Sequence, residues 1–369
     1  MQVALIFVDN MRIGGYQRLA LDEAYALSDR GWETSLLTLE QTNNPNSVIN
    51  LTDIEKDLLA KKGIQVKVLP ESRIKLYFAL RKLLKSVDFS ALVISHSLRS
   101  SFVLKLVQFT VIDSNYKINT KIHQIPQLSD ARQKFKRFLY SQFTDKLYCF
   151  SEAVKSNWYS QFGPSFEWVV NLGKDIKVLR NGVYVPRIPT LSRIQDEIRP
   201  RIIFLGRITF WKGLEVVADL AKVQSLSSFD FVLIVPQWTE DEVEGLRMVL
   251  GNRLKIISGK SINEIKFFQG DIHIYPTQYP FDSSFAESIS LNCLELAVVG
   301  IPSLVTKGGQ QTWTESIFMN YFIEVDWGDV SDVTKKIQSM SLKPINADIQ
   351  LQLLKLVDVN NEIDRLIES

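Results

Sequence analysis

The stretch Arg201-Ile-Ile-Phe-Leu-Gly206-Arg207 indicates the fold most directly. A run of apolar residues ended by a glycine predicts a buried strand. Lys212-Gly213 then starts a helix whose apolar residues recur at helical spacing: Leu214, Val217 and Leu220. In open α/β sheets, ligands bind beyond the carboxyl ends of the strands, so Arg207 and Lys212 flank a turn suited to a pyrophosphate. The alternative is a solvated loop with a lysine ahead of its helix.

Short apolar runs alternate with helical patterns along the rest of the chain. This alternation is typical of βαβ units and parallel sheets. The strand-like runs are 3–8, 34–39, 66–69, 91–95, 146–150, 201–205, 231–235, 272–275 and 302–306. A chain of 369 residues exceeds what one core comfortably supports, so two doubly wound domains are expected. Prolines at 186, 189 and 200 interrupt both periodicities, which predicts the seam at 185–200.

Composition indicates the compartment. Cys149 and Cys293 are too few, and too apolar in setting, for a disulfide framework, so a reducing compartment is expected. Residues 1–9 lack a basic n-region and reach an acid at Asp9, which favours a first buried strand over a signal peptide. No apolar run reaches membrane-spanning length. We therefore expect a cytoplasmic protein.

A second helix start is predicted close to residue 290. Leu291, Leu294 and Val298 repeat at helical spacing, so one face of a helix beginning near 288–290 is apolar. Gly300 followed by Pro302 supplies its stop signal.

Two carboxylates bracket this helix start. Glu287 stands just before the helix and Glu295 lies in its second turn. Free backbone N–H groups and the positive end of the helix dipole favour a phosphate between them. The donor groups expected there belong to Ser290, Leu291 and Asn292.

Gly14-Gly15 follows the first strand and precedes a helix. A glycine pair lets backbone approach a phosphate closely, so Gly15 is a candidate diphosphate contact, although a tight turn alone also accounts for it. The pair does not fit the G-x-G-x-x-G fingerprint, which disfavours a nicotinamide oxidoreductase.

In this order along the chain, the motifs resemble those of the retaining GT-B glycosyltransferases of glycosyltransferase family 4. The matching residues span almost the whole chain: Gly14-Gly15, Asn181-Gly182-Val183, Gly206-Arg207, Lys212-Gly213, Pro276-Thr277, Glu287 with Glu295, and Gly300-Ile-Pro302. The resemblance implies two Rossmann-like domains facing across a cleft. Residues 1–185 would bind the acceptor and 186–350 the nucleotide-sugar donor, with a C-terminal helix at about 351–369 crossing back to the first domain.

The resemblance also implies roles for single residues. Arg207 and Lys212 would bind the donor diphosphate, Glu295 the ribose hydroxyls, and Glu287 would face the transferred sugar. His123 matches the active-site histidine of the family.

Departures from the family pattern do not remove a charged donor contact. Tyr184 replaces the acid usual after Asn-Gly-Val, Gln124 follows His123 where an acid is frequent, and serines at 288 and 290 replace glycines. The loop 278–286 is longer and more aromatic than usual, so sugar preference does not carry over.

The three histidines are far apart in sequence and lack Cys or carboxylate at ligand spacing, so no metal site is expected. His96 and His273 lie in apolar runs and are interpreted as packed residues. His123 closes a short strand-like run at a predicted cleft edge, where an active-site role is as plausible as packing.

Charge is unevenly divided. Residues 1–200 hold 28 Lys and Arg against 19 Asp and Glu, whereas 201–369 hold 15 against 22. Basic residues of the first part cluster in 73–85 and 132–140, both of helical period with aromatic neighbours. Such helices dock on anionic lipid, and taken together the two favour a membrane. For either alone, a solvated basic face is an equal alternative.

The sequence thus predicts a hexosyltransferase that moves a sugar from a UDP- or GDP-sugar, without metal or other cofactor. The preferred acceptor is a glycan or lipid-linked molecule at the inner face of the cell membrane, in polysaccharide, lipopolysaccharide or glycolipid biosynthesis. A soluble acceptor, a GT-B nucleotide-sugar epimerase and a non-catalytic sugar-nucleotide-binding scaffold are the alternatives. Nucleic acid is not an expected partner, and the sugar, linkage and acceptor stay open.

Overall fold

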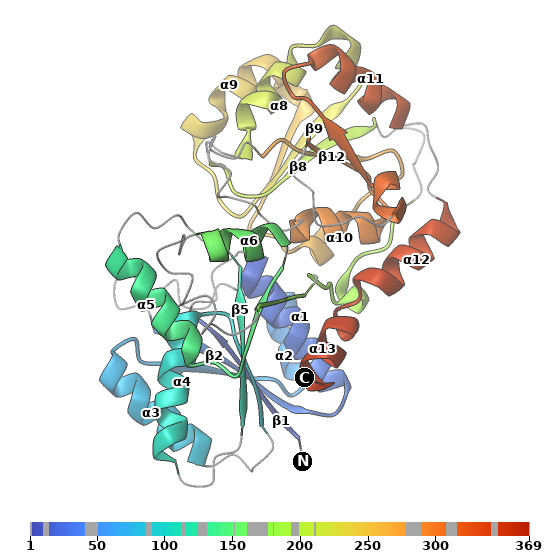
Figure 1. Ribbon diagram of the computed structural model, residues 1–369. Coiled ribbons are helices and arrows are strands. Elements are labelled where there is room, and N and C mark those ends of the chain that lie inside the picture. The colour runs from blue at the N-terminus through green and yellow to red at the C-terminus, as the bar shows by residue number, and fades with distance from the viewer. Residues whose placement is uncertain are drawn as a thin grey trace. The chain divides into compact units, whose positions relative to one another are not determined.

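Figure 1 shows the computed structural model of the chain. It describes residues 2–9, 15–40, 51–85, 91–111, 116–123, 131–150, 152–160, 176–179, 181–192, 199–209, 212–277, 290–307, 316–340 and 346–368. These residues form two compact units, each built on its own parallel sheet. The first unit runs up to Tyr184 and resumes at Val359, and the described residues of the second lie between Val185 and Asp358.

The first sheet has seven strands in the order β3-β2-β1-β4-β5-β6-β7, all parallel to their neighbours. Its strands are β1 (Val3–Val8), β2 (Glu33–Leu39), β3 (Gln65–Leu69), β4 (Ala91–Ser95), β5 (Lys117–Ile122), β6 (Lys146–Cys149) and β7 (Ile176–Val178). Its helices are α1 (Gly15–Asp29), α2 (Asp53–Lys61), α3 (Arg73–Lys85), α4 (Leu98–Thr110), α5 (Ala131–Gln142), α6 (Glu152–Ser160) and α13 (Val359–Glu368).

Helices cover both faces of this sheet because its strands are apolar on both sides. Along β1, Ile6 packs with α1, α2 and α13, whereas Phe7 packs with α3 and α4. Neighbouring residues of a strand point to opposite faces, which explains this division. Strands buried on both faces are typical of parallel sheets.

The C-terminal helix α13 packs beside α1 (Figure 1). The start of α13 lies against Gly182, where an added Cβ would be only 2.4 Å from the Cα of Val359. Val359 donates its backbone N–H to the carbonyl oxygen of Val183 at 3.0 Å. Only glycine permits this approach, which gives the Asn-Gly-Val motif a structural reason.

The second sheet has six parallel strands in the order β10-β9-β8-β11-β12-β13. They are β8 (Arg201–Leu205), β9 (Asp230–Val235), β10 (Leu254–Ser258), β11 (Ile272–Tyr275), β12 (Ser303–Thr306) and β13 (Phe322–Val325). The helices are α8 (Leu214–Ala221), α9 (Glu240–Leu250), α10 (Leu291–Val299), α11 (Val330–Met340) and α12 (Ala347–Val357). Helices α8, α9 and α11 pack on one face and α10 on the other.

Both sheets have the strand order of the doubly wound Rossmann fold, as predicted. The order reverses between β1 and β4 in the first sheet and between β8 and β11 in the second. Such switch points are where ligands bind in folds of this class.

Three features differ from the sequence prediction. The apolar runs did not include the edge strands β7, β10 and β13, which are short or only partly buried. The single helix expected at 351–369 is two helices, because the backbone at Asp358 is extended (φ −61°, ψ 125°). Only the second of them, α13, belongs to the first unit. None of the described helices is long and apolar enough to cross a membrane.

Candidate functional site

The switch point of the second sheet brings two predicted segments together. Gly206 and Arg207 follow β8, and Pro276 and Thr277 follow the neighbouring strand β11. Arg207 is exposed at this edge. The carboxyl ends of two adjacent strands therefore present a cation and a hydroxyl to the same edge.

Lys212 joins these two segments. Its Nζ donates to Tyr275 Oη at 2.7 Å and lies 3.4 Å from Thr277 Oγ1. The ammonium also lies 4.7 Å from the centroid of the Tyr275 ring. The side chain is half-buried and has a fixed direction, as a phosphate contact requires.

Gly213 makes the close approach of these segments possible. It is the N-cap of α8, with a left-handed backbone (φ +75°). A Cβ there would lie 2.3 Å from the carbonyl oxygen of Pro276. A side chain at this position would push the loop after β11 away from Lys212.

The amino end of α10 is fixed to the same edge. Ser290 is the N-cap of the helix, so the helix begins at Leu291, at the end of the predicted range. Asn292 donates from Nδ2 to the carbonyl oxygen of Leu205 at 2.9 Å, and that nitrogen would lie 3.7 Å from a Cβ at Gly206. The first N–H groups of α10 thus stand beside the turn that carries Arg207.

Glu295 has a partner that the sequence did not indicate. Its side chain is completely buried in α10, and its Oε1 accepts a hydrogen bond from Arg187. Arg187 ends the short helix η3 (Val185–Arg187) at the start of the second unit. Both side chains of this ion pair are buried, with 4% of Arg187 and 0% of Glu295 exposed.

Glu287 and Gly14 lie outside the described residues. Gly15 is the first residue of α1 and is exposed there.

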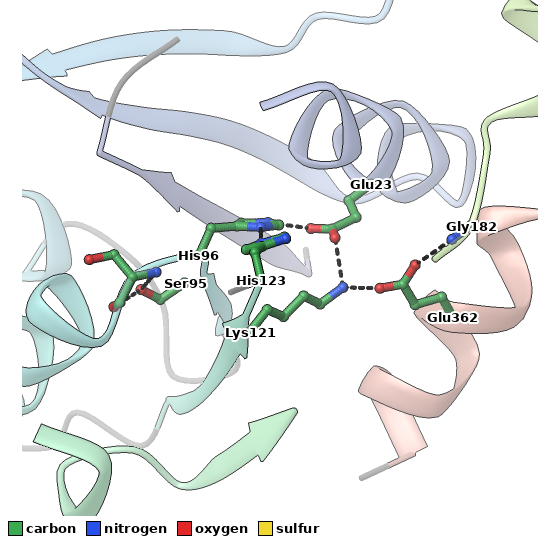
Figure 2. Close-up of polar contacts among 8 residues, drawn as sticks. Glu23, Ser95, His96, Lys121, His123, Gly182 and Glu362 are labelled. Atoms are coloured by element: carbon green, nitrogen blue, oxygen red, sulfur yellow. Dashed lines mark hydrogen bonds and ion pairs between the residues drawn. The ribbon is translucent and has the colours of Figure 1, made fainter. Parts of the chain in front are cut away.

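A polar cluster lies at the ends of β4 and β5 in the first unit (Figure 2). His96 follows β4 and His123 follows β5, and His96 Nδ1 lies 2.7 Å from His123 Nε2. The two rings are nearly parallel, with 16° between their planes and centroids 5.0 Å apart, so they meet edge to edge through these nitrogens. His96 Nε2 lies 3.0 Å from Oε2 of Glu23, a completely buried residue of α1. The interpretation of His96 as a packed residue was therefore incomplete, since it joins His123 to a carboxylate.

Lys121 completes this cluster from within β5. Its ammonium donates to Glu23 Oε1 at 2.6 Å and also to Glu362 of α13. Glu362 in turn accepts a hydrogen bond from the backbone N–H of Gly182 at 3.2 Å. The same lysine thus connects the histidine pair with the C-terminal helix (Figure 2).

The environment sets the charges of the cluster. Burial acts to raise the pKa of Glu23, but Lys121 and His96 outweigh it and leave that pKa below its ordinary value. Burial likewise acts to lower the pKa of Lys121, but Glu23 and Glu362 keep it above its ordinary value. Burial, together with the charge of Lys121, lowers the pKa of His123 well below its ordinary value. Near neutral pH, His123 is therefore neutral beside a carboxylate and an ammonium.

The pKa values of Glu362 and His273 are also shifted. Burial raises the pKa of Glu362 to about 7, despite the attraction of Lys121. His273 is completely buried in β11, and its Nδ1 lies 2.8 Å from Ser303 Oγ. Burial and the charge of Lys212 lower the pKa of His273 to about 3. It is a neutral core residue, as the sequence indicated.

Among the described residues, no three His, Cys, Asp or Glu side chains are grouped so that they could hold a metal ion.

Several of these residues were not identified from sequence, although one signal was available. His96 directly follows a strand, as His123 does, and the carboxyl ends of adjacent parallel strands meet at one edge. Applied to both histidines, this reasoning would have predicted that His96 and His123 lie close together. Glu23 and Arg187 carry no such signal, because their partners are distant in sequence.

No family model matches the chain, and no curated protein matches it. Solved structures do match along its whole length. One is Anabaena Alr3699/HepE in complex with UDP-glucose, with a TM-score of 0.65 at 14% identity, covering 99% of this chain and 98% of that one. Another is a glycosyltransferase from Rickettsia africae, with a TM-score of 0.66 at 15% identity and the same coverage. A third is an alpha-glucosyltransferase in complex with UDP and DNA containing an HMU base, with a TM-score of 0.63 at 11% identity, covering 100% and 99%.

At these identities the likeness shows the fold. The chain has the GT-B fold of two Rossmann-like domains, as the sequence predicted, and its structural neighbours include glycosyltransferases and complexes with UDP or UDP-glucose.

Proposed function

We propose that this chain is a retaining glycosyltransferase of family 4, a hexosyltransferase that uses a UDP- or GDP-sugar. The main observation in support of this proposal is the arrangement of side chains at the switch point of the second sheet. One edge of this sheet, at the carboxyl ends of β8 and β11, carries Arg207, Lys212 and the amino end of α10. Lys212 is fixed there by its hydrogen bond to Tyr275. Two cations and a row of free amides are complementary to a diphosphate, which carries its charge on adjacent oxygens.

The donor is assigned to residues 186–350. Arg207 and Lys212 bind its diphosphate together with the N–H groups of Ser290, Leu291 and Asn292, and Gly15 is a further diphosphate contact from the first unit's sequence. Glu295 binds the ribose hydroxyls, and its carboxylate is positioned by the ion pair with Arg187. The neighbours that bind UDP and UDP-glucose support this assignment.

Transfer rests on electrostatics more than on covalent chemistry. As the sugar leaves, negative charge grows on the diphosphate, and Arg207, Lys212 and the helix amides stabilise it. Glu287 faces the transferred sugar, and His123 positions it for the acceptor hydroxyl. The metal-independent mechanism needs no cation beyond these side chains.

The acceptor is assigned to the first domain, residues 1–185. Its preferred class is a glycan or lipid-linked molecule, so the enzyme acts in cell-surface polysaccharide, lipopolysaccharide or glycolipid biosynthesis at the inner face of the membrane. The support is a basic surface with exposed apolar side chains on helices α3, α4 and α5.

This surface is continuous across three packed helices, since α4 contacts both α3 and α5. Tyr77 Oη of α3 donates to Thr110 of α4 at 2.7 Å, and the rings of Phe102 and Tyr140 stack between α4 and α5. Large apolar side chains are exposed on each helix: Ile74 at 72%, Phe109 at 71% and Phe135 at 52%. The exposed cations around them include Arg73, Lys75, Lys82, Lys85, Arg132 and Lys136. Basic residues interleaved with apolar ones favour an anionic lipid surface.

The experiment is a screen of purified protein against UDP- and GDP-sugars, with and without lipid-linked and soluble acceptors. Transfer to an acceptor, with the anomeric configuration of the donor kept, is the expected result. Release of free sugar or nucleotide at full rate without any acceptor would instead indicate a nucleotide-sugar epimerase. Tight donor binding with no turnover under any condition would indicate a scaffold protein.

A further inference from the structure

The contact between His96 and His123 defines a direction of hydrogen bonding. Glu23 is an acceptor at both oxygens: Oε1 takes a hydrogen bond from Lys121, so Oε2 faces His96 Nε2. A carboxylate has no proton to give, and therefore His96 carries its proton on Nε2. In the neutral ring, Nδ1 of His96 is then an acceptor, and it meets Nε2 of His123 at 2.7 Å.

The contacts from Glu23 through His96 to His123 do not require a positive charge on either histidine. Lys121 lies between two carboxylates, Glu23 at 2.6 Å and Glu362, but burial raises the pKa of Glu362 to about 7, so near neutral pH this second carboxylate is partly protonated. The side chains of Glu23, His96 and Lys121 are shut off from solvent. A buried charge without its own partner is costly. The arrangement with both imidazoles neutral therefore satisfies each contact without further charge.

Building on the proposed function, we infer that Glu23 and His96 are positioning residues for His123. They hold His123 as the neutral tautomer with its proton on Nε2, so that Nδ1 is left to accept a hydrogen bond from a hydroxyl of the sugar or of the acceptor.

The surroundings of His123 agree with this role. Its ring is confined between Tyr16, with centroids 5.4 Å apart, and Phe150, at 4.7 Å. Within the described ranges, Nδ1 of His123 has no hydrogen-bond partner. The ring is only partly buried, whereas His96 and Glu23 behind it are buried. One nitrogen is thus tied to the interior and the other remains for a ligand.

The chain offers a matched control for the role of Glu23. The carboxylates of Glu23 and Glu362 both accept a hydrogen bond from Lys121, but only Glu23 contacts His96. Glu23→Gln and Glu362→Gln each replace one carboxyl partner of the same buried lysine by an amide. An effect specific to Glu23→Gln therefore reports the contact with His96 and not a general loss of the ion pairs.

The first measurement is the tautomer of His123, read from proton–nitrogen correlations of the full-length protein labelled with ¹⁵N-histidine. Only three histidines contribute, and His123→Phe identifies the signal of His123. A single form with the proton on Nε2 is expected in the wild type and in Glu362→Gln. Mixed tautomers are expected in Glu23→Gln. A proton on Nδ1 in the wild type, or a His123 signal that is unchanged in Glu23→Gln, would overturn the inference.

The second measurement is the rate of sugar transfer. Glu23→Gln and His96→Phe should lower kcat by about 10- to 100-fold, as when the partner that orients a functional group is lost. The KM for donor should be unchanged and Glu362→Gln should keep near wild-type kcat. Equal losses of kcat in Glu23→Gln and Glu362→Gln would show that Glu23 and His96 have only a structural role. Absence of sugar transfer by the wild type would refute the proposed function. The tautomer measurement needs no substrate, so it would still decide whether Glu23 and His96 position His123.

Discussion

Arg187 and Glu295 form an ion pair that is buried on both sides, between the first residues of the second unit and helix α10. Breaking one member of such a pair costs about 3–5 kcal/mol, because the other charge stays buried and loses the opposite charge that offset it. Single variants of Glu295 therefore mix two effects, loss of fold stability and loss of the proposed ribose contact.

A paired replacement separates these effects. Arg187→Met combined with Glu295→Leu removes both charges at once, so the stability of the second unit should stay close to that of the wild type. The affinity for UDP, measured by calorimetric titration, should fall by roughly 1.5–3 kcal/mol if Glu295 binds the ribose. The matched control is Arg201→Met with Asp271→Leu, which removes another buried pair of the same unit. Undiminished UDP affinity in the Arg187 and Glu295 double variant would make that pair purely structural.

Gly213→Ala tests the close contact with the loop after β11. The new Cβ would meet the carbonyl oxygen of Pro276, so the substitution should cost about 1–3 kcal/mol beyond the strain of a left-handed backbone. Gly259→Ala is the control, since Gly259 has φ +68° and an added Cβ there meets nothing within 4 Å. Chemical denaturation of both variants measures the difference. Equal losses of stability would show that the loop yields without cost.

His273 predicts how stability depends on pH. Its pKa is lowered to about 3 in the folded chain from an ordinary value of 6.5, by burial and by Lys212. The unfolded chain therefore binds more protons between these values, and stability is lost as pH falls below about 6.5. One such group contributes at most about 1.4 kcal/mol per pH unit.

Replacing His273 by Asn keeps a polar atom near Ser303 but removes the titrating ring. Denaturation curves of both proteins from pH 7 to pH 5 should converge, because only the wild type loses the His273 contribution over this range. Other titrating groups are shared and cancel in the comparison. Parallel stability curves would contradict the assignment of His273 as a neutral buried base.

Membrane binding should depend on salt and on α5. Each cation near an anionic surface contributes about 1 kcal/mol before screening, so replacing Lys134, Lys136 and Arg137 by Gln should weaken binding to anionic vesicles strongly. The control replaces three exposed lysines of the second unit, Lys222, Lys260 and Lys335. Vesicle sedimentation at low and high salt measures both. Equal and salt-insensitive binding of the two variants would favour a soluble acceptor.

The parallel sheets and the loops that carry the proposed donor site were predictable because their signals are local. Residues 201–207 carry an apolar run, a glycine and a cation in sequence order. Helices α8 and α10 beside them have apolar residues at helical spacing, and Gly300 and Pro302 mark the end of α10. What sequence reasoning missed depends on pairs that are distant along the chain. Glu23 and His96 are 73 residues apart, and Arg187 and Glu295 are 108 apart. No periodicity records such contacts, and the edge strands were missed because they bury too little to form a clear apolar run.

The most direct test of the donor site is calorimetric titration of UDP and GDP into the wild type and two single variants. Arg207→Ala and Lys212→Ala should each weaken binding of the preferred nucleotide by roughly 1.5–3 kcal/mol, the scale of a charge-assisted hydrogen bond. Lys222→Ala removes a cation from the other end of helix α8 and should bind like the wild type. Full affinity in both Arg207→Ala and Lys212→Ala, or a wild type that binds neither nucleotide, would contradict a donor site at this switch point.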